Sequence, residues 1–327
     1  MSRLTIGLTA LVVLLFVVSL VVGPARIGAM ESLRALLWDS ETPMTLVMRD
    51  IRLPRAILAV IIGGGLGMAG AALQGFLRNP LAEPGLIGVS GSAALGAVIA
   101  LQTGIATATA FALPLAALLG ATISVLLLIA LAGPGGSSLT LILAGVAISA
   151  LAGALTTLVL NLSPNPFATS EIVFWMMGSL ADRSFAHVWL AGPFVVVGAG
   201  LLLWLRPGLA ALTLGEDVAQ SLGIRLQTLR LALIFGVALV VGASTAVAGA
   251  IGFVGLVVPH ILRPWVGASP ARLLPASALG GAAMVLAADI AVRVLLPEKD
   301  LKLGVLTAIV GVPLFLHLIL KTRKGQI

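Results

Sequence analysis

Apolar runs of about twenty residues recur along the whole chain and constrain its fold more than any other feature. An α-helix rises 1.5 Å per residue, so a run of this length crosses a hydrocarbon core of roughly 30 Å. A transmembrane β-barrel would instead alternate apolar and polar residues in segments of about ten. The sequence therefore predicts an all-α polytopic membrane protein. A mean hydropathy of +1.18, with only 9% charged residues, excludes a water-soluble globular domain.

The apolar runs give nine hydrophobic segments. They cover residues 4–23, 56–77, 85–101, 109–132, 139–160, 187–205, 231–262, 273–296 and 303–320. A shorter run, 172–180, cannot cross the bilayer and predicts a half-helix or a surface helix. The first run resembles a signal peptide ending near Gly23, but its apolar core is longer than that of such peptides, so we interpret it as an uncleaved first helix.

The run at 231–262 decides how many spans the chain has. As one helix its 32 residues would be about 48 Å long, and Gly249 and Pro259 offer places to break. Basic residues within 206–230 and 321–324 both suit the cytoplasmic side, which requires an even number of spans between them. Two passes within this run satisfy the requirement. We therefore predict ten transmembrane helices with short broken or half-helices among them, and both termini in the cytoplasm.

One long polar segment, residues 213–230, interrupts the apolar chain and reads TLGEDVAQSLGIRLQTLR. A segment of this composition must stand in water, and the same parity places it on the cytoplasmic side with the C-terminal tail. Glu216 and Asp217 suit the first turn of a short helix, and Gly223 suits its end. The segment is thus predicted to form a short cytoplasmic helix that a partner can contact.

Several kinds of chemistry are excluded. No GxxxxGK[ST] pattern is present, so the chain cannot bind ATP through a P-loop. It has no cysteine, which excludes disulfides, thiolate catalysis and cysteine-ligated metal centres. The net charge of +7 comes from basic residues flanking the spans, so no nucleic-acid partner is expected. His260, beside Arg263, is the weak candidate for an intramembrane enzyme, which would need a nucleophile, a base and an oxyanion site together.

Ionisable groups inside the spans are scarce. Asp289 and Arg293 lie four residues apart on one predicted helix, close enough to pair. Charges within a membrane can mark a transport path or a proton relay. An ion-coupled secondary transporter would show more such groups near the midplane, which favours energy supplied by another protein. The ion-coupled transporter stays the more distant alternative.

Glycine is abundant, at 38 residues, and concentrates in the predicted helices. Gly63 and Gly67 form a GxxxG pair, which lets two helix backbones approach closely in lipid. A faint internal repeat is also present, because the spacing from Arg55 to Gly67 recurs from Arg230 to Gly242. In the ten-span arrangement these stretches have opposite orientations, as in an inverted repeat.

Seven stretches together carry a family resemblance that covers nearly the whole chain. They are RLPR at 52–55, QGFLRNPLAEPGLIGVSGSAALG at 74–96, LAGVAIS at 143–149, the polar segment, GAIGFVGLVVPHILR at 249–263, SALGGAAMVLAADIAVR at 277–293 and LGVLTAIVGVPLFL at 303–316. In these stretches the chain resembles the FecCD-type permeases of bacterial ABC importers for iron-siderophores, haem and cobalamin.

The resemblance implies a type II ABC importer permease fold, with residues 1–327 as a single transmembrane domain in the bacterial inner membrane. It implies a second permease copy as a homodimer, an ABC ATPase dimer, a periplasmic substrate-binding protein and surrounding membrane lipid as partners. The expected cargo is an iron-siderophore or related metal chelate, with haem and cobalamin as alternatives. The chain itself is expected to bind no cofactor, with ATP and magnesium on the ATPase, and to catalyse no reaction.

The resemblance also assigns roles to residues. The ATPase-coupling residues lie within a cytoplasmic segment at about 213–228: Leu214, Gly215, Glu216, Asp217, Ala219, Leu222 and Gly223. The residues expected to dock the binding protein are Arg52, Arg55 and Arg293. The residues expected at the cytoplasmic gate are Asn79, Leu81 and Ser138, and those expected along the translocation path are Ser149, Thr156 and Thr157. No catalytic or metal-ligating residue is expected.

Overall fold

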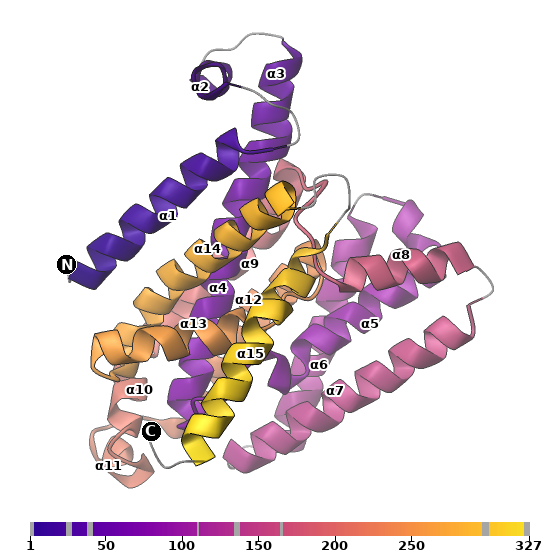
Figure 1. The fold of residues 1–327 in the computed structure, drawn as a ribbon. Coiled ribbons are helices and arrows are strands. Elements are labelled where there is room, and N and C mark those ends of the chain that lie inside the picture. The colour runs from indigo at the N-terminus through magenta and orange to yellow at the C-terminus, as the bar shows by residue number, and fades with distance from the viewer. Residues whose placement is uncertain are drawn as a thin grey trace.

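The structure is a computed structural model, and it describes residues 3–23, 28–37, 42–109, 111–133, 138–163, 166–295 and 301–323. All regular elements in these ranges are helices (Figure 1). The α-helices are α1 (Arg3–Val21), α2 (Ala29–Leu37), α3 (Pro43–Leu46), α4 (Leu53–Leu77), α5 (Val89–Gln102), α6 (Ala112–Ala132), α7 (Ser138–Asn161), α8 (Pro166–Met176), α9 (Phe185–Trp204), α10 (Arg206–Leu212), α11 (Glu216–Ser221), α12 (Leu226–Ala248), α13 (Val254–Leu262), α14 (Pro270–Leu295) and α15 (Leu303–Arg323). One π-helix, η1 (Val47–Arg52), and three 3-10 helices, η2 (Pro84–Ile87), η3 (Ile105–Thr107) and η4 (Arg263–Val266), complete the described elements.

The predicted membrane-spanning architecture is confirmed. Seven helical runs of the described chain are long and apolar enough to cross a membrane: α1, α3–η1–α4, α6, α7, α9, α12 and α14. Three shorter apolar runs accompany them: α5, α13 with η4, and α15. Together they account for the ten spans expected from the sequence, with α5 and α13 as the short members.

The run at 231–262 does contain two helices, as charge parity required. α12 ends at Ala248 and α13 begins at Val254. Gly249, at the end of α12, has φ 71°, and a Cβ there would collide with the carbonyl oxygen of Trp175. Phe253, at the start of α13, also has a left-handed backbone, with φ 67°. The helix therefore breaks at Gly249, one of the two positions that the sequence offered.

Two details differ from the sequence prediction. No helix was predicted between residues 26 and 55, yet α2 forms there, and α3 and η1 extend α4 at its N-terminal end. This extension starts where the Thr42 side chain accepts from the Thr45 N–H at 3.4 Å, with Pro43 in the first turn. The short run predicted at 172–180 is helix α8, which begins six residues earlier, at Pro166.

Helix α4 lies at the centre of the bundle, where α14, α13, α9 and α12 pack around it. In the membrane-spanning stretch that includes α4, 78% of the residues are buried, whereas in that of α1 only 6% are. Helix α1 lies at the edge of the bundle, where it packs against α14. The GxxxG prediction is confirmed at this centre, because a Cβ on Gly63 would collide with the carbonyl oxygen of Gly281 on α14. The backbones of α4 and α14 thus meet directly.

Candidate coupling and docking sites

The polar segment forms a bend at the end of the bundle where α15 also ends (Figure 1). Helix α10 leads into it, Gly215 turns the chain with φ 106°, and α11 follows. Gly223, with φ 83°, ends α11 as predicted. Its N–H donates to Gln220 at 2.8 Å, while the Ile224 N–H donates to Ala219 at 3.0 Å. These paired bonds form a Schellman motif, which fixes the shape of the bend.

The outer surface of this bend combines acidic and apolar side chains. Glu216 and Asp217 are exposed in the first turn of α11, next to Leu214 at 64%, Val218 at 44% and Leu222 at 62% exposure. Ala219, in contrast, is fully buried and holds α11 on the bundle. Exposed apolar groups rimmed by charge mark a protein interaction surface.

The bend contacts the end of α4. Arg78 ends that helix in a left-handed conformation, and its NH2 lies 3.6 Å from Oε1 of Glu216. Both side chains are about half exposed, so this ion pair contributes little stability. Its importance is positional, because the next residue is Asn79, the first of the predicted gate residues. The pair therefore places α11 beside the start of the predicted gate segment.

The predicted gate segment is a tight turn between α4 and η2. Asn79 is exposed, and its Oδ1 accepts from the N–H of the half-buried Leu81 at 2.9 Å. This bond preserves a non-helical turn, as the Asn-Pro pair predicts. Gly88, which follows η2, lies against Ile148 of α7. Ser138 is the first residue of α7, and its side chain lies outside the part that the structure describes.

Polar contacts connect this turn and the end of α4 to the start of α13, a link that the sequence did not reveal. The Phe253 N–H at the N-terminus of α13 donates to Oε1 of Glu83 at 2.8 Å, across 170 residues of sequence. Gln74 donates to the carbonyl of Gly255 at 3.3 Å and accepts from Arg263 at 2.7 Å. The NPLAEP and GFVG stretches are therefore one structural unit.

The three predicted path residues on α7 have different surroundings. Thr157 is exposed, and its hydroxyl donates to the Gly153 carbonyl at 3.0 Å within the helix. Ser149 is half-buried, whereas Thr156 is buried against the rest of the chain. Most of the described surface of α7 is not covered by the rest of the bundle. Only Thr157 of the three therefore lies fully on the uncovered face.

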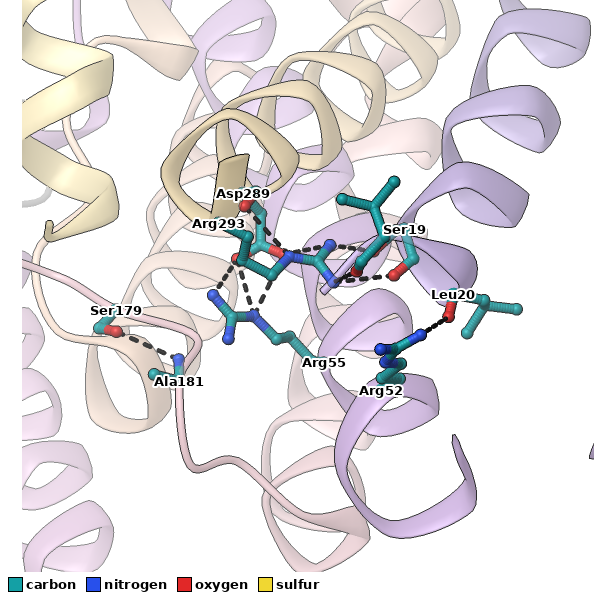
Figure 2. Close-up of polar contacts among 9 residues, drawn as sticks. Ser19, Leu20, Arg52, Arg55, Ser179, Ala181, Asp289 and Arg293 are labelled. Atoms are coloured by element: carbon teal, nitrogen blue, oxygen red, sulfur yellow. Dashed lines mark hydrogen bonds and ion pairs between the residues drawn. The ribbon is translucent and has the colours of Figure 1, made fainter. Parts of the chain in front are cut away.

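Two of the three predicted docking arginines, Arg55 and Arg293, meet at one carboxylate (Figure 2). Arg55 Nε donates to Oδ1 and Oδ2 of Asp289 at 2.9 and 3.1 Å, and its NH2 lies 2.8 Å from Oδ1. Arg293 NH2 lies 2.9 Å from Oδ2 of the same side chain, which confirms the predicted i,i+4 pair. Asp289 is only 1% exposed, so two guanidinium groups neutralise a carboxylate that is out of contact with solvent.

The same group of arginines binds the end of α1. Arg52 and Arg293 donate to backbone carbonyls that have no partner within that helix, and Arg293 also donates to the Ser19 hydroxyl at 2.6 Å. Four carbonyls accept these bonds, at 2.7 to 2.9 Å: Ser19, Leu20, Val21 and Val22. Cations at the negative end of a helix stabilise it. These contacts attach an otherwise exposed α1 to the bundle.

The docking role of these arginines stays a prediction. In this conformation Arg52 and Arg293 are 3% and 8% exposed, and the Arg55 side chain is 16% exposed. All three are held by groups of the chain itself. Sequence reasoning missed Arg55 as the second partner of Asp289. The signal for it was physical, since a carboxylate inside a membrane span needs a neutralising charge.

Comparison with known proteins agrees with this architecture. The FecCD transport family model matches residues 11–321. The chain is 36% identical to the hemin transport system permease protein HmuU of Yersinia pestis, over 96% of this chain and 95% of that protein. It is 38% identical to the vitamin B12 import system permease protein BtuC of Klebsiella pneumoniae, over 98% and 94% respectively.

A solved structure of a metal-chelate type ABC transporter in an inward-facing conformation superposes with a TM-score of 0.87 at 33% identity, covering 98% of this chain and 99% of that one. The family match extends over nearly the whole sequence, and the relatives are transporter permease proteins, which are not themselves enzymes. The chain therefore belongs to the FecCD transport family of ABC importer permeases.

Proposed function

We propose that this permease carries an iron-siderophore or related metal chelate across the bacterial inner membrane. It works with an ATPase dimer that binds ATP and magnesium, and with a periplasmic protein that delivers the chelate. Haem and cobalamin, the cargoes named for two relatives, are the alternatives within the same family. Both termini lie in the cytoplasm in this arrangement, with α11 on the same side.

One observation carries the proposal: an exposed acidic and apolar bend lies at one end of a chain that has no P-loop of its own. Such a bend fits a groove on a separate ATPase, and its contact with Arg78 connects it to the gate turn. The uncovered face of α7 supports a second permease copy as the partner that completes the pathway. That face includes apolar side chains such as Leu139 and Leu143, which are 64% and 60% exposed.

The test is uptake into proteoliposomes that contain the permease and its ATPase. Ferric siderophore, haem and cobalamin are each offered on the binding-protein side, with ATP inside. We expect uptake of a ferric chelate that stops when the ATPase carries an inactivating substitution. Uptake driven by a proton gradient without ATP would contradict the importer mechanism and favour an ion-coupled transporter. Uptake of haem or cobalamin alone would assign the other cargo.

Reversing the charge of the bend is expected to prevent ATPase docking. In the variant Glu216→Lys/Asp217→Lys, two cations replace the two anions in the first turn of α11. The new cations are also unfavourable there because the N-terminus is the positive end of the helix dipole. We expect the affinity for the ATPase to fall at least about tenfold, measured by co-purification and titration. Glu31→Lys, at an exposed position on α2, is the control and should bind normally. Unchanged affinity in the double variant would contradict the coupling role.

The docking prediction needs a control that separates binding from folding. Arg52→Glu/Arg55→Glu is expected to weaken capture of the binding protein at least about tenfold, because opposite charges orient such complexes. The same change also removes contacts to α1 and Asp289. Asp289→Asn is the matched control, since it disturbs the network but keeps both arginines. Equal loss of capture in both variants would show that the arginines act only on the permease structure.

A further inference from the structure

A polar cavity of about 260 Å³ lies near α8, at the end of the bundle opposite α11 (Figure 1). Residues of η3, α6, α8, α9 and the end of α12 line it. Its polar lining includes Glu171, Trp175, Arg183 and His187. None of these residues belongs to the coupling bend, the gate turn or the arginine network.

Hydrogen-bond donors without protein partners collect in this cavity. Arg183 donates from Nε to the Val247 carbonyl at 2.6 Å, and its two terminal nitrogens have no acceptor among the described residues. Burial lowers the pKa of the Arg183 guanidinium, and the neighbouring Asp182 opposes this without forming an ion pair within the described chain. A partly buried guanidinium in this condition favours an anionic ligand.

His187 adds a second donor. Its Nδ1 lies 3.2 Å from the Ser184 backbone N–H and accepts from it. The neutral ring therefore carries its proton on Nε2, which is free to donate. The indole N–H of Trp175 is also buried without an acceptor in the described part of the chain. Arg183 and His187 thus offer donors to a group that is rich in acceptors.

An apolar groove of about 540 Å³ continues along the same three helices, α6, α9 and α12. On α9, Phe194 of the groove lies seven residues, or about 10 Å, beyond His187 of the polar cavity. On α6 the lining passes from Pro114 in the cavity to Leu118 in the groove, one turn further. Phe235 of the groove, on α12, is 44% exposed, so the groove is open at the outer surface of the bundle.

We propose that the cavity and the groove together hold one membrane glycerophospholipid. Its phosphate lies at Arg183 and His187, and an acyl chain follows the groove along α6 and α9. Glu171 lines the same cavity from α8, so a headgroup with an ammonium, such as ethanolamine, fits better than an uncharged or anionic one. The required chemistry, an anion joined to a long apolar chain, matches the order of donors and apolar side chains along these helices.

The test is native mass spectrometry of the delipidated permease, purified with its ATPase and titrated with phosphatidylethanolamine. We expect Arg183→Gln to weaken binding about tenfold, since a charge-assisted hydrogen bond is lost. Arg34→Gln, at an exposed arginine on α2, should leave binding unchanged. Glu171→Gln should remove the preference for phosphatidylethanolamine over phosphatidylglycerol.

The groove is tested by a second matched pair on α6. Thr122→Trp fills the groove from an exposed position and is expected to weaken lipid binding, whereas Ile123→Trp, also exposed but outside the groove lining, is not. Soluble glycerophosphoethanolamine should bind far more weakly than the lipid. If it bound equally well and Thr122→Trp had no effect, the site would be one for a free phosphate compound. Unchanged lipid binding in Arg183→Gln and Thr122→Trp would also overturn the proposal.

Discussion

Replacing Asp289 by alanine is expected to destabilise the folded permease by about 3–5 kcal/mol. The carboxylate is 1% exposed and forms ion pairs with both Arg55 and Arg293, at 2.8 and 2.9 Å. Without it two guanidinium groups remain in a region of low polarity with no counter-charge, and their repulsion is unscreened. Arg293 also donates to the carbonyl end of α1. The substitution should therefore loosen α1 as well as the contact between α4 and α14.

Thermal unfolding of the detergent-purified permease, followed by size-exclusion chromatography, measures this effect. Asp50→Ala is the control, because it removes an exposed carboxylate from η1, at the same end of the bundle. We expect the midpoint of unfolding to fall only for Asp289→Ala. Arg55→Leu/Asp289→Leu should be more stable than Asp289→Ala, since one uncompensated cation is removed together with the anion. Equal midpoints for Asp289→Ala and Asp50→Ala would mean that the buried pairs contribute no stability.

The sequence predicted the spans well because a bilayer imposes a length on every apolar helix. It also offered Gly249 as one place for the break in the run at 231–262, and the structure breaks there, since glycine permits the left-handed backbone. It did not predict α2, a short helix of mixed polarity whose formation depends on packing against its neighbours. The bilayer imposes no minimum length on a helix outside the spans, so the sequence of such a short helix cannot be told from that of a loop.

The site was predicted unevenly for a similar reason. The coupling bend could be read from the sequence, because a polar segment must leave the membrane and Gly223 marks a helix end. The pairing of Arg55 with Asp289 could not, since 234 residues separate them and only the packing of α4 on α14 brings them together. The same is true of Glu83 and the start of α13. Resemblance assigned Arg55 to a partner protein, while the fold gives it an internal one.

Replacing Gly67 by leucine is expected to prevent recovery of folded permease, at a cost of about 3 kcal/mol or more. A Cβ at this position would collide with the carbonyl oxygen of Ser277 and lie 3.2 Å from the Cα of Gly281. Both obstacles are backbone atoms of α14, so no side chain can rotate aside. The two helices would have to separate, and α4 is the element around which the bundle packs.

Gly7→Leu provides the control, because a Cβ at Gly7 on the outer helix α1 meets nothing within 4 Å. Both changes replace a helical glycine by leucine, so both raise intrinsic helix propensity by a similar amount. Any loss of a monodisperse chromatographic peak confined to Gly67→Leu must therefore come from the contact with α14. Gly67→Ala should lie between wild type and Gly67→Leu, since one methyl group requires a smaller separation. A normal peak for Gly67→Leu would mean that α4 and α14 need not touch, and the bundle would then depend on its outer contacts instead.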